Sequence, residues 1–201
     1  EFWDSTLREG EQEQGVHFSL EEKKEIGSAL FENGLAQTIE LHCYEGYTSR
    51  EASELVKEFG PDRVVLHHRS LTSDIDVSRD CGAPIAMYLG ISDIHLKTMN
   101  MTRESAIEKI ENDIRYARGL GMKVRKYTLE DATRADIAFM REAAKRIERA
   151  GAETLCLADT VGSAFPDDYK RMVQELGSGL GIPILAHCHN DLGLALANCL
   201  A

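Results

Sequence analysis

The sequence predicts an α/β fold, a parallel (β/α)8 barrel, and two features of the chain carry this prediction. Short apolar runs alternate with longer amphipathic segments from one end to the other, which is the pattern of repeated βα units around a parallel sheet. The alternation passes through seven strand-like runs without an antiparallel signal, and no G-x-G-x-x-G motif follows the first run. A TIM barrel that stops here after about strand seven therefore fits better than an open doubly wound sheet.

Each expected strand is short and mostly apolar, as is typical of strands buried on both faces of a parallel sheet. The clearest helix start is Ser19 with Glu22 three residues later, a capping box in which each side chain bonds the other residue's backbone N–H. Asn33 and Gly34 end that helix. We expect strands at 2–6, 38–42, 63–67, 85–90, 123–128, 154–158 and 183–187, and further helices at about 49–59, 73–81, 103–118, 134–150 and 167–176.

The length and the two ends of the chain bear on domain organisation. The 201 residues suffice for one domain with a substantial core, and 43% of them are hydrophobic, as in ordinary globular proteins. The chain opens inside a strand-like run without an initiator Met and closes as a new helix begins. We therefore expect a single catalytic barrel domain over 1–201, incomplete at its C-terminus, with the eighth unit beyond Ala201.

Charge and composition exclude several classes of protein. The net charge of -11 disfavours a nucleic-acid binder, because phosphate neutralisation needs clustered Lys and Arg. No apolar run approaches the roughly 20 residues that span a bilayer, so we expect no membrane partner and a cytoplasmic location. The five cysteines are scattered and form no CxxC pair, which indicates buried free thiols instead of a disulfide framework or a zinc ribbon.

Polar residues gather where the expected strands end. The working groups of parallel barrels lie at the C-terminal ends of the strands and in the loops that follow. Six of the seven histidines fall at such places, and imidazole is less typical of a merely solvated rim than Lys, Glu or Ser. The residues at these ends are Asp4, Arg8, Glu9, Gln12, Glu40, His42, His67, His68, Ser92, Asp93, His95, Arg125, Lys126, Tyr127, Thr128, Glu130, Asp159, Thr160, His187, His189, Asn190 and Asp191.

The H-C-H segment is the sharpest of these features. His187 and His189 are two apart on a strand and point the same way, so they can present two imidazoles to one ion. A pair of hydrogen-bonded histidines at a strand end is the alternative. A carboxylate from the segment 4–12 would complete a set of two histidines and one carboxylate that leaves positions open for a substrate. A charged loop whose acids only cap the next element is the alternative there.

These two segments resemble those of a known superfamily. Residues 4–12 (D-S-T-L-R-E-G-E-Q) and 187–195 (H-C-H-N-D-L-G-L-A) are similar to the motifs of the 2-isopropylmalate, homocitrate and citramalate synthases, which are HMGL-like barrels of the DRE-TIM metallolyase superfamily. The segments 92–95 (S-D-I-H), 130–132 (E-D-A) and 158–162 (A-D-T-V-G) also match that pattern in order and spacing. The resemblance thus covers the whole chain.

The resemblance implies a metal-dependent acyltransferase that condenses acetyl-CoA with a 2-oxo acid in a Claisen-type reaction. It implies that Glu9, His187 and His189 bind a divalent ion (Mg2+, Mn2+ or Zn2+), with Asp4 in support. It also implies that Arg8 steadies the 2-oxo group and its negative charge.

Further roles follow from the same resemblance. Thr160 would contact the substrate carboxylate, Gln12 and Asn190 would organise the site, and Glu130 would act in acid–base chemistry or contact the acyl-CoA. The synthases also carry a C-terminal region that often completes the site of the partner subunit. We therefore expect a homodimer in the full-length protein, and that region could also hold the catalytic base.

The choice of 2-oxo acid is left open by the sequence. Homocitrate synthases have a histidine at the end of strand three and a basic residue on strand five, which match the distal carboxylate of 2-oxoglutarate. This chain resembles them at His67, Arg125 and Lys126. The alternative is that the Arg or Lys points outward and binds no substrate. The segments 92–95 and 192–195 look more like isopropylmalate and citramalate synthases. The expected catalytic residues are Arg8, Glu130 and His67, and the expected substrate-binding residues are Arg8, Gln12, His67, Lys126, Thr128 and Thr160.

Two other functions remain as alternatives. A lyase or aldolase of the same superfamily would also need a metal-held enolate, although R-E-G-E-Q in place of a D-G-L-Q type loop argues against it. A non-catalytic metal-binding barrel would be expected to lose Arg8, Glu9, His187 or His189, and all four are present.

Overall fold

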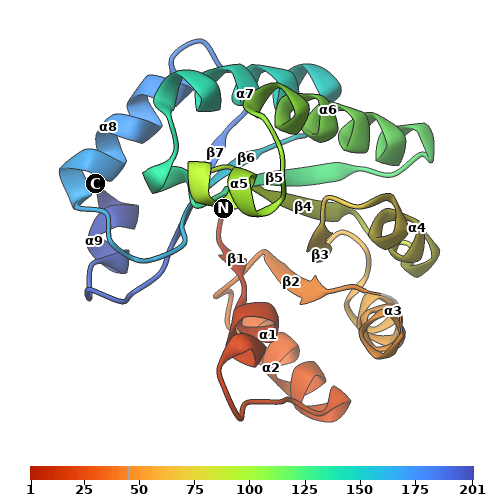
Figure 1. Cartoon of the computed structure of the whole chain (residues 1–201). Coiled ribbons are helices and arrows are strands. Elements are labelled where there is room, and N and C mark those ends of the chain that lie inside the picture. The colour runs from red at the N-terminus through yellow and green to blue at the C-terminus, as the bar shows by residue number, and fades with distance from the viewer. Residues whose placement is uncertain (45) are drawn as a thin grey trace. The chain divides into compact units, whose positions relative to one another are not determined.

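The computed structural model describes residues 1–44 and 46–201. Seven strands follow one another in the sheet in the order of the chain, and the pairs β1–β2, β2–β3, β5–β6 and β6–β7 are parallel. This confirms the predicted fold class, an α/β barrel fold represented by its first seven strands (Figure 1). The elements are β1 (Trp3–Asp4), α1 (Thr6–Glu9), η1 (Gly10–Gln12), α2 (Leu20–Glu32), β2 (Thr38–His42), α3 (Tyr47–Phe59), β3 (Val64–Arg69), α4 (Thr72–Cys81), β4 (Ile85–Gly90), α5 (Asp93–Thr98), α6 (Arg103–Gly119), β5 (Val124–Glu130), η2 (Ala132–Arg134), α7 (Ile137–Ala150), β6 (Leu155–Asp159), α8 (Pro166–Gly177), β7 (Ile184–Cys188) and α9 (Ala195–Leu200).

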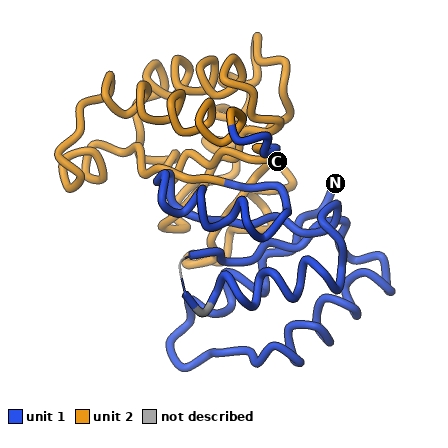
Figure 2. Tube along the Cα trace, turned by 90° about the vertical axis from the view of Figure 1, so that its right-hand side faces the viewer, with its two compact units in different colours: residues 1–86, 120–123 blue, residues 87–119, 124–201 orange. Residues whose placement is uncertain are grey.

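The chain divides into two compact units, which Figure 2 shows in different colours. The first unit comprises residues 1–86 and 120–123, and the second comprises 87–119 and 124–201. Each unit has its own paired strands and its own helices. The prediction of a single barrel domain over 1–201 stays a prediction.

The first unit is built on β1, β2 and β3. Ile39 and Leu41 of β2 pair in register with Val64 and Leu66 of β3, and all four side chains are buried. Alternation along a strand sends Glu40 to the opposite face. The apolar face therefore belongs to the packed core, and the polar face is available for chemistry.

The second unit is built on β5, β6 and β7. Helices α6 and α7 lie side by side over it (Figure 1), and the buried Tyr169 of α8 donates a 2.7 Å hydrogen bond to the carbonyl oxygen of Leu157. Arg118 at the end of α6 donates to the carbonyl oxygen of Gly151, which ends α7, at 2.7 Å. These bonds tie α6 to α7 and α8 to the sheet.

The predicted bounds agree closely with the structure for most elements. The predicted strands 38–42 and 85–90 coincide with β2 and β4, and the capping box at Ser19 is present, since Ser19 N donates to Glu22 Oε2 at 2.7 Å and Glu22 N donates to Ser19 Oγ at 3.3 Å. Every helix of the described part of the chain is too short or too polar to cross a membrane.

Three predicted strand ends, at 6, 67 and 128, and two predicted helix starts, at 49 and 134, differ from the structure by two or three residues, and short helices were missed. The first strand ends at Asp4 instead of residue 6, because the Asp4 carboxylate accepts hydrogen bonds from the backbone N–H and the hydroxyl of Thr6 and turns the chain into α1. The helix predicted at 134–150 begins at Ile137, because Asp136 caps it by accepting from the backbone N–H of Phe139 at 2.8 Å. The short elements α1, η1, α5 and η2 were not predicted.

Candidate active site

The segment that follows β1 forms a helical turn that aims Arg8 and Glu9. The carbonyl oxygen of Ser5 accepts the backbone N–H groups of Arg8 and Glu9 at 2.9 and 2.7 Å. The two charged residues of the R-E pair therefore stand on a fixed turn directly after a strand, at the end where parallel barrels carry their functional groups.

Arg8 forms a buried ion pair with Glu40 of β2. Its Nε donates to Glu40 Oε2 at 2.8 Å, and only 5% of Arg8 and none of Glu40 is exposed to solvent. Ser5 donates to the same carboxylate at 3.0 Å, and Arg8 also pairs with Glu9. Burial lowers the pKa of Arg8, but the carboxylates of Glu40 and Glu9 outweigh that effect and hold this pKa above its ordinary value. Arg8 is thus a permanent cation in a fixed position.

His42 and His67 lie on the same face of the first unit as Glu40. The register of β2 and β3 pairs His42 with His67, and alternation along β2 places Glu40 and His42 on one face. His67 is buried, whereas Gln12, predicted to bind substrate, is exposed at the end of η1. Burial, together with the positive charge of Arg8, lowers the pKa of His42. Of the predicted site residues, Arg8, Glu9, Gln12 and His67 belong to the first unit.

A buried ion cluster in the first unit was missed by sequence analysis. The Lys23 ammonium of α2 contacts Glu51 at 2.7 Å and Glu11 at 2.9 Å. Burial lowers the pKa of Lys23, but its hydrogen bonds to Glu51 and Glu11 raise the pKa above its ordinary value. The cluster anchors the loop that carries Glu11 and Gln12. A buried lysine in an otherwise exposed-looking helix gives little sequence signal, because its two partners come from distant segments.

In the second unit, the side chains of β5 point alternately to the two faces of the sheet. Thr128 pairs with Cys156 of β6, and Ala158 of β6 pairs with His187 of β7. Registered partners and residues two apart share a face, so Lys126 and Thr128 face the same side as His187. Both are buried. Arg125 points to the opposite face, so of the two cations considered for substrate binding only Lys126 lies on the histidine face.

His187 and His189 are close neighbours, as their spacing predicts. Their ring centroids are 5.1 Å apart with planes at 82°, and both residues are half-buried. The backbone N–H of His189 donates to the carbonyl oxygen of Asp159 at 3.2 Å, which continues the strand pairing past the end of β7. Glu9 belongs to the first unit and the two histidines belong to the second.

Asp159, at the end of β6, holds three segments of the second unit. Its fully buried carboxylate accepts from Thr133 Oγ1 at 3.0 Å and from the backbone N–H groups of Ser163 and Ala164 at 3.2 and 3.1 Å. Asn198 of α9 donates to it at 3.5 Å. The Asp159 carbonyl also holds His189, so this residue shapes the loop after β6 through its own backbone and side chain.

Asp131 is a second organising residue that sequence analysis did not assign to a role. It is buried with φ of 60°, a left-handed conformation that aspartate tolerates better than most residues. Its carboxylate accepts two bonds from Arg134 at 2.8 and 2.7 Å and lies 3.3 Å from His95 Nδ1. Its backbone N–H donates to Thr160 Oγ1 at 2.8 Å, which leaves the Thr160 hydroxyl proton available to a ligand. Asp131 thereby fixes Thr160, while Glu130 precedes it at the end of β5.

Replacing Asp131 with Asn should lower the free energy of unfolding by about 1–3 kcal/mol at neutral pH. At acidic pH the difference between the two proteins should be smaller. Burial raises the pKa of Asp131, but the hydrogen bonds from Arg134 and Ser92 and the charge of Arg134 outweigh it and lower the pKa overall. A carboxylate with a lowered folded-state pKa contributes stability above its unfolded pKa of about 3.9 and loses that contribution as the pH falls through the folded value. Denaturation of both proteins from pH 7 to pH 3 would measure this. The exposed Asp167→Asn is the control, and a constant cost across the range would contradict the prediction.

Replacing Gly162 with Ala should destabilise the second unit by about 1–3 kcal/mol. A Cβ at Gly162 would lie 2.5 Å from Asp191 Oδ2 and 2.8 Å from the Asp191 backbone nitrogen, and φ at Gly162 is 59°. Gly179→Ala is the matched control, because its φ of 85° imposes the same kind of strain with no atom within 4 Å of the added Cβ. Chemical denaturation would show equal losses for the two variants if the close approach to Asp191 were unimportant.

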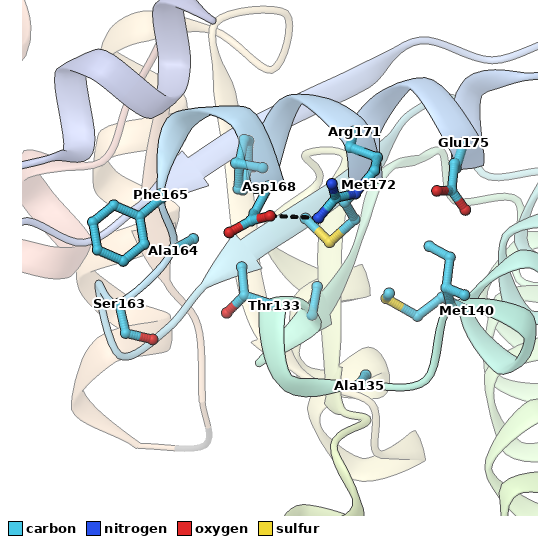
Figure 3. A pocket seen from close by; sticks show the side chains of 13 residues that line it. Thr133, Ala135, Met140, Ser163, Ala164, Phe165, Asp168, Arg171, Met172 and Glu175 are labelled. Atoms are coloured by element: carbon cyan, nitrogen blue, oxygen red, sulfur yellow. Dashed lines mark hydrogen bonds and ion pairs between the residues drawn. The ribbon is translucent and has the colours of Figure 1, made fainter.

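A separate cavity of about 430 Å³ is lined on one side by η2 and the start of α7 (Figure 3). On the other side it is lined by helix α8 and the loop that precedes it. Thr133 and Met172 approach it from opposite sides, and Asp168 pairs with Arg171 at its edge. Among the residues that the structure describes, those that line it include none of the predicted site residues. This cavity is therefore distinct from the face that carries Lys126, Thr128 and His187.

The comparison with known families decides where the chain belongs. The family model described as HMGL-like matches residues 1–201. The chain belongs to the HMGL-like family. The family resemblance predicted from the sequence motifs is thereby confirmed.

Two homocitrate synthases are among the proteins similar to this chain. The chain is 40% identical to the homocitrate synthase of Sulfolobus acidocaldarius and 38% identical to that of Sulfurisphaera tokodaii, with 98% of the chain aligned in each case. The aligned part is 44% and 45% of those proteins, so the chain spans less than half the length of these relatives.

Solved structures of other proteins share this fold. The HMG-CoA lyase of Bacillus subtilis aligns with a TM-score of 0.79 at 16% identity, over 98% of this chain and 71% of the lyase. The carboxyl transferase domain of Rhizobium etli pyruvate carboxylase aligns with a TM-score of 0.75 at 14% identity, over 98% of this chain and 37% of that one. At these identities the likeness establishes the fold alone.

Proposed function

We propose that this chain is the barrel of a metal-dependent synthase that condenses acetyl-CoA with a 2-oxo acid. The observation that carries the proposal is the 40% identity to a homocitrate synthase across 98% of the chain, which includes the predicted motifs. In such a reaction the methyl carbon of acetyl-CoA loses a proton and bonds to the carbonyl carbon of the 2-oxo acid, and hydrolysis of the thioester then releases CoA.

Glu9, His187 and His189 are the proposed ligands of a divalent cation. Each offers one donor atom, and two imidazoles with one carboxylate suit Mg2+, Mn2+ or Zn2+ while leaving positions open. Two observations support these ligands. The imidazoles of His187 and His189 lie close together in the second unit, and Glu9 stands on the turn that follows β1. A cation bound there would supply Lewis-acid polarisation of the 2-oxo group.

Arg8 is the proposed stabiliser of negative charge on the 2-oxo oxygen. Its ion pair with Glu40 fixes the guanidinium, and its raised pKa keeps it charged throughout the working pH range. Thr160, whose hydroxyl oxygen already accepts from Asp131, can donate its proton to the substrate carboxylate. Glu130 is the last residue of β5 and directly precedes Asp131, and it stays a candidate for proton transfer or for contact with the acyl-CoA.

A dicarboxylic 2-oxo acid of the 2-oxoglutarate type is the proposed substrate. Lys126 is buried on the face of His187, where its charge would complement a substrate carboxylate, and His67 offers an imidazole on the polar face of the first unit. Thr128 lies two residues from Lys126, and its buried Oγ1 has no protein partner among the described residues. That hydroxyl is well suited to bind a substrate carboxylate. Gln12, the homodimer and the cytoplasmic location stay predictions.

The test uses the full-length protein with Mg2+ or Mn2+ and follows acetyl-CoA-dependent thiol release. Pyruvate, 2-oxoisovalerate, 2-oxoglutarate, oxaloacetate and phosphonopyruvate form the panel. We expect release with 2-oxoglutarate, and a loss of about 10³-fold or more in Glu9→Ala and in His187→Ala. Glu13→Ala, an exposed acid on the same loop, should keep wild-type activity.

The other outcomes assign the alternatives. Release with a different acid would overturn the proposed substrate and keep the reaction. Absence of release with every acid, together with cleavage of a 3-hydroxyacyl-CoA, would replace the synthase by a lyase. Metal binding without either reaction would indicate a non-catalytic barrel.

A further inference from the structure

Two cysteines of the first unit lie in contact although their distant positions in the sequence give no sign of a pair. Cys43 follows the last residue of β2 and is buried, and Cys81 is the last residue of α4 and is partly exposed. Their sulfur atoms are 3.7 Å apart, whereas a disulfide needs about 2.05 Å. Joining them requires movements that shorten this separation by less than about 2 Å.

The surroundings make the two thiols unequal. Ser53 of α3 donates its hydroxyl to Cys81 Sγ at 3.3 Å, and the hydrogen bond with Cys43 together with that from Ser53 outweighs burial and lowers the pKa of Cys81 to about 6. The same contact and burial raise the pKa of Cys43. Cys81 thus has the lower pKa and is the more accessible of the two sulfurs, which are the properties of an attacking thiol.

We propose that Cys81 and Cys43 form a thiol–disulfide exchange site whose reaction partner is a low-molecular-weight disulfide such as oxidised glutathione. The Cys81 thiolate attacks one sulfur of the small disulfide, whose S–S bond breaks and releases one thiolate. Cys43 then gives its proton to that thiolate and attacks Cys81 Sγ, which forms the protein disulfide and releases the second small thiol. Two protein thiols are oxidised and one small disulfide is reduced, so no other reactant is needed.

The position of the pair gives the oxidation a structural consequence. The backbone N–H of Cys43 donates to the carbonyl oxygen of His67 at 3.3 Å, and Cys43 directly follows His42. A Cys43–Cys81 bond would tie the C-terminal end of α4 to the strand ends that carry these histidines. It would also close a long loop through α3 and β3, which should raise the unfolding midpoint of the first unit.

The experiment uses the full-length protein and does not depend on its catalytic activity. The native protein is incubated with oxidised glutathione, alkylated after denaturation, and mapped by peptide mass spectrometry. We expect a peptide that links Cys43 to Cys81 and a loss of two hydrogens from the protein mass, without lasting glutathione at Cys81. In Cys43→Ser, glutathione should accumulate on Cys81, and Cys199→Ser, which changes an exposed cysteine, should leave the cross-link unchanged.

Three results would overturn the proposal. In the first, Cys81 of the wild type keeps a stable glutathione adduct and no cross-link forms. In the second, the cross-link forms only in denatured protein. In the third, iodoacetamide alkylates Cys81 of the native protein no faster than Cys199. The last measurement and the wild-type peptide map need no variant, so a folding defect in Cys43→Ser would leave both of these tests intact.

Discussion

Replacing Glu40 with Ala should destabilise the folded protein by about 3–5 kcal/mol, because it leaves the buried Arg8 guanidinium without its main partner. Arg8 and Glu40 are almost completely shielded from water and are joined at 2.8 Å. Under the proposed function, thiol release should also fall by at least about ten-fold, since Arg8 would turn toward Glu9. Chemical denaturation and the thiol-release assay of the full-length protein measure the two effects.

Two controls separate burial from charge at this site. Glu54→Ala removes an acid from an exposed ion pair with Lys57 and should cost about 0–1 kcal/mol. The double variant Arg8→Met with Glu40→Leu should be more stable than Glu40→Ala alone, because it removes both buried charges. A Glu40→Ala variant that loses less than about 1 kcal/mol would show that solvent or Glu9 compensates Arg8.

Replacing Asp159 with Ala should cost about 3–5 kcal/mol, since four donors lose a charged acceptor in a buried place. Those donors are the Thr133 hydroxyl, the Asn198 side-chain amide and the backbone N–H groups of Ser163 and Ala164. The loop after β6 would then lose its anchor, and Thr160 within that loop should shift. Hydrogen exchange should accelerate in the residues around 160–164, and under the proposed function the KM for the 2-oxo acid should rise more than kcat falls.

A conservative variant and a surface variant test this account of Asp159. Asp159→Asn keeps one acceptor oxygen and should retain part of the stability. Asp167→Ala removes an exposed acid from the first turn of α8 and should cost at most about 1 kcal/mol. Equal losses in Asp159→Ala and Asp167→Ala would refute the role of Asp159 as an anchor.

Local patterns predicted most of the fold because each depends on neighbouring residues. The capping box at Ser19 needs only Glu22, and the alternating pattern of β2 needs only its own five residues. The start of α7 at Ile137 and the turn at α1 were not predicted correctly, because single side chains of Asp136 and Asp4 decide them against the general periodicity.

The candidate site could be predicted only in part for a related reason. H-x-H spacing places His187 and His189 on one face whatever surrounds them, and the strand-end rule selects Arg8, Thr160 and Lys126. Neither rule separates Lys126 from Arg125 until the strand register is known, because a shift of one residue exchanges the two faces.

The sequence by itself determined the fold class, the family and the residue types gathered at the strand ends, because periodicity, caps and motif order are properties of the chain. Only the tertiary structure decided which of these groups have partners. The pairing of Arg8 with Glu40, the anchoring of three segments by Asp159, the cluster around Lys23 and the contact of Cys43 with Cys81 join residues from separate segments of the chain. Their energies depend on burial and distance, which no local pattern encodes.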